Sequence, residues 1–441
     1  MERLTRLLVS GAIVLALSMI HAGPVAAFDG FGEASAEATF EGGVTFEVEL
    51  RGGAPDLLEL LISTPGADGE FVAPVEPTGD VARYVWDTSV DHLTPNTTIA
   101  YRWRATVGDE VTESEPETVL HDDDRAGLDW QAETLGEATV HWYGDAEDQA
   151  RRFGEITADG VERAEDLLGV ELAAPVDIFV YESREEFFGA LGPGAREWTG
   201  AAAFPELRTI FMWLGGGSES YLEVAMVHEV THIVFHDATD NPFHEPATWL
   251  NEGVAVWSET QDASAERNAV AAEASSGGLL AFEALSAQFP IDDRGGRLAY
   301  AEGAAMIDLI IDRFGTDALA AIAAAYRDGA SDAQALEAGT GIGADELYAD
   351  FFAEFGVGEP ERIEAEEILP SDVERPPADD GGGGGNGGGD DDPPAAPSEP
   401  DEPDESTQAW VTIAVLVAAA AIGLGAAVVV MRRSAGRDQA Q

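Results

Sequence analysis

Short runs in which apolar and polar residues alternate dominate the chain between positions 28 and 122. This period of two is typical of strands that bury one face of a sheet. The clearest runs occupy residues 44–50, 82–86 and 99–105. Turn-forming pairs, among them Pro65-Gly66 and Pro95-Asn96, separate these runs. Short strands at this spacing predict a β-sandwich over residues 28–122, which could serve as a spacer or as a binding module.

The pattern changes at Asp123, where strand-like and helical periods begin to alternate. Strand character marks residues 138–143, 176–181 and 208–214. Residues 146–168 place apolar side chains on one side of a helix, and Ser183 and Ser218 are candidate N-caps of two more helices. Helical periodicity then marks residues 295–314, 317–326 and 345–355. We therefore expect an α+β fold, in which residues 123–356 form one domain with a mixed sheet first and a helical half after it.

Both ends of the chain carry targeting signals. Residues 1–27 combine early arginines, an apolar run and small residues, which is typical of a secretory signal peptide; a retained anchor is the alternative. Residues 409–431 carry no charge and, at about 1.5 Å per residue, reach about 34 Å, enough to cross a hydrocarbon core of about 30 Å. The acidic, Gly/Pro-rich linker 357–408 precedes this segment, and the tail 432–441 begins with two arginines. By the positive-inside rule we expect a single-pass type I protein of the cell membrane, with its folded domains outside the cytoplasm.

The composition excludes two kinds of site and suggests a habitat. The chain has no cysteine, so it can form neither disulfides nor thiolate metal sites. The formal net charge is -61 and all 23 basic residues are arginine, so nucleic acid is not an expected partner, because neutralising phosphates requires basic patches. Residues 359–405 hold 17 of the 84 acidic residues, so the folded part is itself strongly acidic. We hypothesise a high-salt habitat, which full folding and activity in dilute buffer would contradict.

The candidate chemistry lies in His228-Glu229-Val230-Thr231-His232, which has the form H-E-x-x-H. On a helix, positions i and i+4 project from one face, so His228 and His232 can offer imidazole nitrogens to one ion at about 2.0–2.1 Å. Glu229 projects from an adjacent face and can act as a general base on a water at the metal without being a ligand. The pattern alone is suggestive, and two ordinary polar histidines on a helix are the alternative.

Glu252, the acidic residue of a W-L-N-E-G run, is the best candidate for the third ligand. It follows His232 by twenty residues, which leaves room for the first helix to end and for a second helix to return. Two histidines and one glutamate are a known ligand set of catalytic zinc. His236 shares a face with His232, but it lies eight residues, or about 12 Å, from His228 and cannot join the same ion.

The H-E-x-x-H helix followed by W-L-N-E-G resembles the gluzincin metallopeptidases, most closely the bacterial peptidase MA-like group. The similarity extends over most of residues 123–356. It implies His228, His232 and Glu252 as zinc ligands and Glu229 as the base. It also implies that the strand near residues 209–213 is an edge strand that pairs with extended peptide substrate. Separately, residues 93–105 resemble the late strands of fibronectin type III domains, in agreement with a fibronectin- or immunoglobulin-like sandwich.

Departures from the family pattern bear on the mechanism. Thermolysin-like gluzincins place an aspartate four residues after the ligand glutamate to orient a histidine, whereas this chain has Val256. The G-x-M-E-N motif, with which the aminopeptidase branch binds the substrate amine, is absent upstream, so the resemblance does not extend to exopeptidase action. Tyr300 lies where related enzymes often have the tyrosine that stabilises the oxyanion. A buried core tyrosine is the alternative for Tyr300, and His244 is a weaker candidate for the same role.

These features predict a membrane-anchored, extracytoplasmic zinc peptidase that hydrolyses protein or peptide substrates, with Glu229 as general base. One alternative is a non-catalytic zinc-binding interaction module of the cell surface, in which a base beside the metal would have no use. Another is a cell-surface interaction protein whose sandwich and stalk carry the function. Within the hydrolases, another amide substrate stays open.

Overall fold

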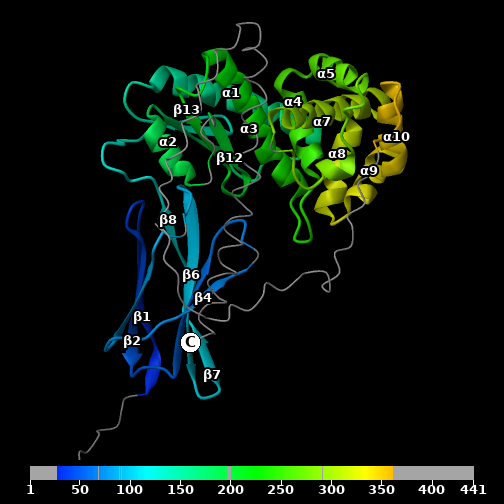
Figure 1. Cartoon of the computed structure of the whole chain (residues 1–441). Coiled ribbons are helices and arrows are strands. Elements are labelled where there is room, and N and C mark those ends of the chain that lie inside the picture. Colours follow the sequence, from blue (N-terminus) through cyan, green and yellow to red (C-terminus); the bar gives the residue numbers. More distant parts are fainter. Residues whose placement is uncertain are drawn as a thin grey trace, which may run out of the picture.

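The computed structural model describes residues 27–360, apart from positions 68, 89, 91, 194, 196–199 and 291. The predicted membrane segment 409–431 and tail 432–441 lie outside these residues. Most of the predicted linker, and the predicted signal peptide apart from its last residue, lie outside them as well. None of the helices in the described part of the chain combines the length and the apolar character that a membrane crossing needs. Figure 1 shows an elongated β unit below a broader part, in which a sheet with helices lies beside a mainly helical half.

The N-terminal unit consists of two sheets with the strand orders β1-β2-β5 and β4-β3-β6-β7, and β8 also pairs with β6. The strands are β1 (Phe28–Thr39), β2 (Gly43–Gly52), β3 (Leu57–Ser63), β4 (Phe71–Pro74), β5 (Val81–Trp86), β6 (Thr97–Val107), β7 (Glu110–Glu113) and β8 (Glu117–His121). The three alternating runs lie within β2, β5 and β6, and their inward side chains include the fully buried Phe46 and Trp103. Both sheets contribute to one apolar core, so the unit is a sandwich. Its relation to fibronectin type III domains stays a prediction.

The upper sheet has the order β12-β13-β11-β10-β9. Its strands are β9 (Gln131–Leu135), β10 (Ala138–Trp142), β11 (Val176–Tyr181), β12 (Ala201–Phe204) and β13 (Thr209–Trp213). The three central strands are parallel, and the two outer ones pair antiparallel with their neighbours. Helices α1 (Glu147–Leu168) and α3 (Glu219–Thr239) share an apolar core with one face of the sheet, and α2 (Arg184–Leu191) packs with an aromatic cluster on the other face. The predicted mixed sheet is therefore present, with helices on both faces.

The edge of this sheet nearest the candidate site is β12, not β13. Strand β13 pairs with β12 on one side and with β11 on the other, so the expectation that residues 209–213 form a substrate-pairing edge is wrong. Strand β12 escapes sequence analysis because it has four residues, three of them alanine, which has a low strand propensity. No strand among the described residues pairs with its outer side.

The helical half follows α3. It contains α4 (Thr248–Thr260), α5 (Ser264–Ala274), α6 (Phe282–Leu285), α7 (Asp293–Phe314), α8 (Asp317–Arg327), α9 (Asp332–Thr340) and α10 (Ala344–Glu354). Helices α4 and α7 cross with their backbones in contact, because a Cβ on Gly253 would lie 2.6 Å from the carbonyl carbon of Gly303. This close crossing places α7 directly behind the helix that carries Glu252.

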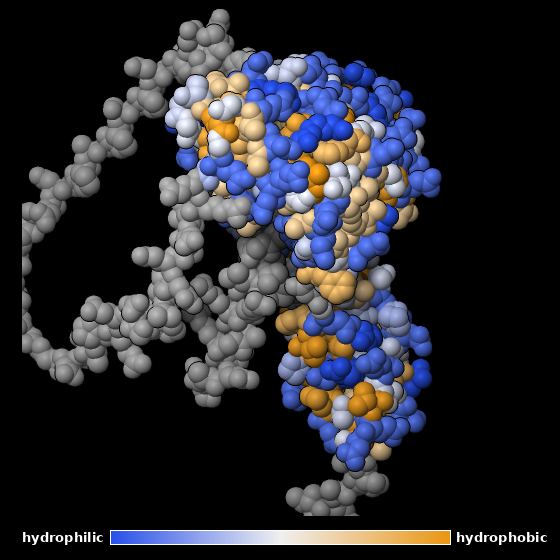
Figure 2. Space-filling model, turned by 90° about the vertical axis from the view of Figure 1, so that its right-hand side faces the viewer, coloured by the Kyte–Doolittle hydropathy of each residue, from blue (hydrophilic) through white to orange (hydrophobic). Residues whose placement is uncertain are grey.

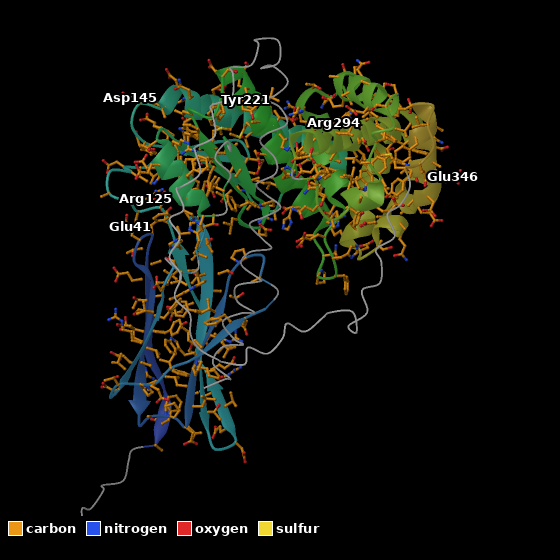
Figure 3. The ribbon with its side chains drawn as sticks, in the orientation of Figure 1. Glu41, Arg125, Asp145, Tyr221, Arg294 and Glu346 are labelled. Atoms are coloured by element: carbon orange, nitrogen blue, oxygen red, sulfur yellow. The ribbon has the colours of Figure 1, made fainter. Side chains whose placement is uncertain are left out.

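Polar contacts join the sandwich to the sheet above it. Asp123 is buried and accepts hydrogen bonds from Arg125 Nε (2.7 Å) and from the hydroxyl of Tyr181 on β11 (2.9 Å). The Arg125 guanidinium also lies over the ring of Phe40 from the sandwich, 4.3 Å from its centroid. Figure 3 shows Arg125 at this junction. Asn96, also from the sandwich, donates to the hydroxyl of Thr209 at the start of β13 (2.8 Å). The sandwich is thus fixed against the mixed sheet.

The surface of the described residues is mainly hydrophilic. Residues 27–360 hold 66 acidic residues and 16 arginines, so most carboxylates have no arginine to pair with. On the face that Figure 2 presents, hydrophilic residues cover most of the upper part, and hydrophobic residues gather in small groups on the sandwich. The acidic excess is therefore a property of the folded part as well as of the linker.

Candidate metal centre

Helix α3 carries His228, Glu229 and His232 through the interior of the molecule. The helix begins after Ser218, whose hydroxyl accepts a hydrogen bond from the backbone N–H of Tyr221 (3.3 Å), as the sequence predicted. All residues from 225 to 235 are buried, so apolar side chains surround the helix on every side. The two histidines and Glu229 are each 2 % exposed. Such burial of polar side chains requires partners, which the neighbouring elements supply.

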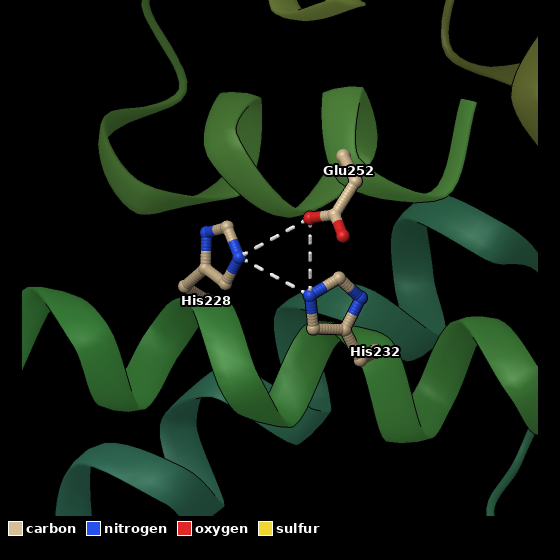
Figure 4. A group of neighbouring side chains, drawn as sticks. All are labelled: His228, His232 and Glu252. Carbon is tan, nitrogen blue, oxygen red and sulfur yellow. Dashed lines mark hydrogen bonds and ion pairs between the residues drawn. The ribbon is translucent and has the colours of Figure 1, made fainter. Parts of the chain in front are cut away.

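The third side chain comes from the second turn of α4, where Glu252 faces both histidines (Figure 4). The Nε2 atoms of His228 and His232 lie 3.1 Å apart. Glu252 Oε2 is 3.6 Å from the first of these atoms and 3.5 Å from the second. Among the residues that the structure describes, these three form the one group of histidine and acidic side chains arranged to hold a metal ion.

The other nitrogen of each histidine is already engaged. His228 Nδ1 donates to Glu259 Oε1 (2.8 Å), two turns beyond Glu252 on α4. His232 Nδ1 donates to Asn251 Oδ1 (2.9 Å). Because an acceptor fixes the proton on each Nδ1, both Nε2 lone pairs point toward the same place as Glu252 Oε2. Three acceptors thus converge on one point.

The spacing of these acceptors fits zinc. Ligand atoms at 2.0–2.1 Å from a tetrahedral ion lie about 3.3 Å from one another, close to the observed separations of 3.1, 3.5 and 3.6 Å. Glu252 Oε2 is buried and accepts no hydrogen bond within the described part of the chain. A buried oxygen without a partner is costly, and a cation removes that cost. The donor set of two imidazoles and one carboxylate is one that zinc uses in catalytic sites.

The charges around the histidines favour a cation as well. Burial by itself would lower the pKa of His228, but the neighbouring carboxylates of Glu252 and Glu259 raise that pKa to about 10. Burial lowers the pKa of His232, and the attraction of Glu252 does not reverse this effect. The carboxylates around the two rings therefore favour positive charge at this point, and a metal cation would supply it.

Glu229 lies on a different side of α3 and contacts the edge strand. Its Oε2 accepts a hydrogen bond from the backbone N–H of Ala203 on β12 (2.8 Å). Burial raises the pKa of Glu229 to about 7, although the neighbouring His228 and the Ala203 amide oppose the shift. The carboxylate is consequently held between the two histidines and the outer side of β12, where a general base would need to be.

The remaining predicted residues occupy other positions. Tyr300 is buried on α7 with its ring edge-on to Phe289 (4.9 Å between centroids), one turn before Gly303. It therefore lies on the helix next to the ligand helix, and its role at the oxyanion stays a prediction. His236 belongs to the last turn of α3, outside the cluster, as its spacing predicted. The ring of His244 packs near Tyr326, 5.9 Å between centroids.

The residues that orient the histidines were not predicted from the sequence. Val256 departs from the thermolysin-like pattern, and nothing at that position can orient a histidine. The structure supplies Glu259, seven residues after Glu252, and Asn251, directly before it. A spacing of seven is two helical turns, so the signal was present in the sequence. Burial, together with the negative charges of Glu229 and Glu259, also raises the pKa of Tyr221, which places this tyrosine in the electrostatic field of the site.

Residues 156–354 match the model of the Peptidase MA superfamily, a segment that contains the whole metal centre. None of the curated proteins searched matches the chain. An M1 zinc metallopeptidase from Deinococcus radiodurans is similar in structure, with a TM-score of 0.32 and 13% identity over 75% of this chain and 94% of that chain. A mutant of a two-domain M1 zinc metallopeptidase bound to L-tryptophan is also similar in structure, with a TM-score of 0.31. The identity is 12%, over 75% of this chain and 98% of that chain. At these TM-scores the similarity alone assigns neither fold nor activity.

Proposed function

We propose that this chain is a zinc-dependent peptidase. The observation that carries the proposal is the convergence of His228 Nε2, His232 Nε2 and Glu252 Oε2, with both Nδ1 protons fixed by acceptors. The match of residues 156–354 to the Peptidase MA superfamily supports the same conclusion independently of the geometry. The presence of Glu229 favours a catalytic site over a purely structural one, because a structural zinc site needs no buried carboxylate beside its ligands.

The three converging side chains would hold the ion, and Glu259 and Asn251 would keep both rings in the binding tautomer. When bound, zinc would supply the polarisation of the peptide carbonyl and would lower the pKa of a water molecule. Glu229 takes the proton of the attacking water and returns it to the leaving amine, so one carboxylate serves both proton transfers. Tyr300 is the candidate for stabilising the oxyanion.

The outer side of β12 is the proposed binding site for the substrate backbone. The N–H of Trp213 donates to the carbonyl of Gly200, and the N–H of Ala203 donates to Glu229 on the opposite side. Alternate residues of a strand face opposite sides, so Ala201 and Ala203 direct their carbonyl groups outward. An extended peptide that adds to this edge lies next to the base. This arrangement favours peptides over compact amides as substrates.

The proposed location rests on sequence alone. The charge-free segment 409–431 and the arginines after it support a single-pass anchor with the metal centre outside the cytoplasm. Proteolysis of intact cells expressing the full chain tests this proposal. Removal of the folded part by an external protease is expected, whereas complete protection would contradict it.

The decisive experiment combines zinc analysis with a peptide library, and compares the wild-type chain with Glu229→Gln. The wild type is expected to hold one zinc ion per chain and to cleave peptides. The variant is expected to retain zinc while hydrolysis falls by about 10²–10⁴-fold, because it loses the proton acceptor. Glu219→Gln, in the exposed first turn of the same helix, is the matched control and is expected to behave as wild type.

Two outcomes would overturn the proposal. A Glu229→Gln protein that binds zinc and cleaves at the wild-type rate would exclude Glu229 as the base. A wild-type protein that binds zinc without cleaving any peptide would support the non-catalytic zinc-binding module instead.

A further inference from the structure

The edge strand β12 ends abruptly beside the sandwich. Directly after Phe204, the 3-10 helix η1 (Pro205–Leu207) turns the chain out of the strand direction. Arg208 follows in the left-handed region (φ 48°) and its Nη2 binds both carboxylate oxygens of Asp237 on α3, at 2.9 and 2.8 Å. The turn that ends the strand is therefore fixed to the helix that carries the metal ligands.

A tight turn of the sandwich packs against this end. The segment from Thr64 to Ala67 forms a β-turn closed by a hydrogen bond from the Ala67 N–H to the Thr64 carbonyl (3.3 Å). Pro65 occupies its second position, and Gly66, with φ 73°, occupies the third, which is the arrangement of a type II turn. A Cβ on Gly66 would lie 2.7 Å from Cγ of Glu206 in η1. Only a glycine allows both this backbone conformation and this close approach.

The contact is held from a second point. Asn96, also from the sandwich, donates to the hydroxyl of Thr209, the first residue of β13, two residues after η1 ends. Figure 1 shows the upper end of the sandwich directly beneath the part that contains β12. The Thr64–Ala67 turn thus forms a wall that packs against the end of the strand.

We infer that this wall limits how many substrate residues can precede the cleaved bond, an inference that rests on the proposed peptidase function. A peptide that pairs antiparallel with β12, the more stable arrangement, directs its N-terminal part toward η1. Glu206 lies three residues beyond Ala203, at most about 10 Å at about 3.3 Å per residue, because the chain leaves the strand after Phe204; no more than about three substrate residues therefore fit before they meet the wall. The preferred substrate is a peptide cut close to its N-terminus, and Glu206 and the Pro65-Gly66 turn set the limit.

The test uses the full-length zinc-loaded protein and a nested set of peptides around one cleavage site found with the library. The C-terminal part stays constant while the N-terminal part grows from one to about eight residues. The value of kcat/KM is expected to fall about tenfold once the N-terminal part exceeds about three residues. The inactive Glu229→Gln protein is expected to show the same fall in peptide affinity, measured by fluorescence anisotropy.

Two variants test whether the Thr64–Ala67 turn and Glu206 set the limit on peptide length. Glu206→Ala removes the side chain that meets the turn, and Pro65→Ala loosens the turn. Both are expected to reduce the penalty on long peptides relative to short ones, Glu206→Ala the more strongly. Glu346→Ala, at an exposed position of α10, is the control and is expected to keep the wild-type length profile (Figure 3). Thermal melting checks that each variant is folded.

The outcomes are distinguishable. A flat length profile, a limit on the C-terminal side, or a limit that neither Glu206→Ala nor Pro65→Ala moves would overturn the inference while leaving the peptidase proposal intact. A protein that binds no zinc and cleaves no peptide would overturn the peptidase proposal itself.

Discussion

Two groups of buried charged residues, one at the junction with the sandwich and one at the metal centre, differ in how their carboxylates are balanced. At the junction, Asp123 pairs with Arg125, so each charge meets its opposite. At the centre, Glu229, Glu252 and Glu259 surround two imidazoles, and no arginine among the described residues forms an ion pair with any of them. A balanced pair needs no further partner, whereas an excess of buried negative charge requires either a cation or a proton. Balance therefore distinguishes a structural cluster from a binding site.

The largest effect is expected from removing a converging ligand. His232→Ala leaves two of the three acceptors, and we expect zinc affinity to fall about a thousandfold and hydrolysis to fall with it. Competition with a chelator of known affinity measures the change. His236→Ala, one turn further along α3, is the control that is expected to retain zinc. Equal loss in both variants would mean that the histidines act through the helix rather than as ligands.

At the junction the expected effect is on folding. Asp123→Ala leaves the half-buried Arg125 without its counterion, which is expected to lower the free energy of unfolding by about 3 kcal/mol. Urea titration measures this loss, and zinc content is expected to stay at the wild-type level. Asp129→Ala, an exposed neighbour, is expected to change stability by less than about 0.5 kcal/mol. Loss of zinc in the Asp123 variant would show that the two clusters are coupled.

Glu259→Ala probes the orientation of His228 without removing a ligand. Its loss frees the Nδ1 proton and allows the ring to turn, so we expect zinc affinity to fall by about 10–100-fold. Ser258→Ala, the adjacent position on α4, is expected to leave the affinity unchanged. If the Glu259→Ala variant keeps the wild-type zinc affinity, the Glu259 carboxylate does not orient His228 and only balances charge.

Glu302 shows a third way to bury a carboxylate. It lies on α7, fully buried, with Oε1 accepting the backbone N–H of Leu280 (2.9 Å). Burial raises its pKa to about 8, opposed by the Leu280 amide and reinforced by Glu273, so at neutral pH it takes up a proton instead of pairing with a cation. Its unfolded pKa is near 4.3, so the native state binds the extra proton and stability falls as pH rises from about 4 to about 8.

The corresponding variant is Glu302→Gln, which keeps an acceptor for Leu280 and cannot ionise. We expect it to flatten the pH dependence and to stabilise the protein at pH 8 by an amount on the order of 2 kcal/mol. Urea titrations at pH 5 and pH 8 measure both quantities. Parallel wild-type and variant curves would show that another group carries the pH dependence.

The smallest expected effect concerns the exposed charges. The 66 acidic residues against 16 arginines in residues 27–360 repel one another, and salt screens this repulsion. The melting temperature is expected to rise by several degrees between about 0.1 and 1 M NaCl. Zinc affinity is expected to change little, because the centre is buried. A melting temperature independent of salt would contradict the high-salt hypothesis.

The sequence predicted the parts of the fold that periodicity determines. Long amphipathic segments gave α1, α7 and α8 to within a few residues, and alternation gave β2, β5 and β6. Short helices and strands were not predicted, because they contain too few residues to show a clear hydrophobic period. The alanines of β12 and the four-residue α6 are examples. The edge of the sheet could not be located, since strand order depends on contacts between distant segments.

The candidate site was predictable where one helix holds both partners. His228 and His232 follow from a spacing of four, and Glu252 followed from its distance along the chain. The hydrogen bond between Ala203 and Glu229 was not predictable, because it joins a short strand to a helix 26 residues away in sequence. The contact between Gly66 and Glu206 was less predictable still, because it joins the sandwich to the domain that follows it, and the sequence patterns of the two units are unrelated.

The crossing of α4 and α7 constrains how this centre can evolve. A Cβ on Gly253 would meet backbone atoms of Gly303, and a Cβ on Gly303 would lie 2.8 Å from the carbonyl oxygen of Trp249. Because the opposing atoms belong to the backbone, no change of side chain on the other helix can make room. Related chains that keep the metal centre are therefore expected to keep both glycines, even where the surrounding helix surfaces have diverged. One glycine directly follows Glu252 and the other follows Tyr300 by three positions, so the pair is a marker for recognising distant chains that share this arrangement.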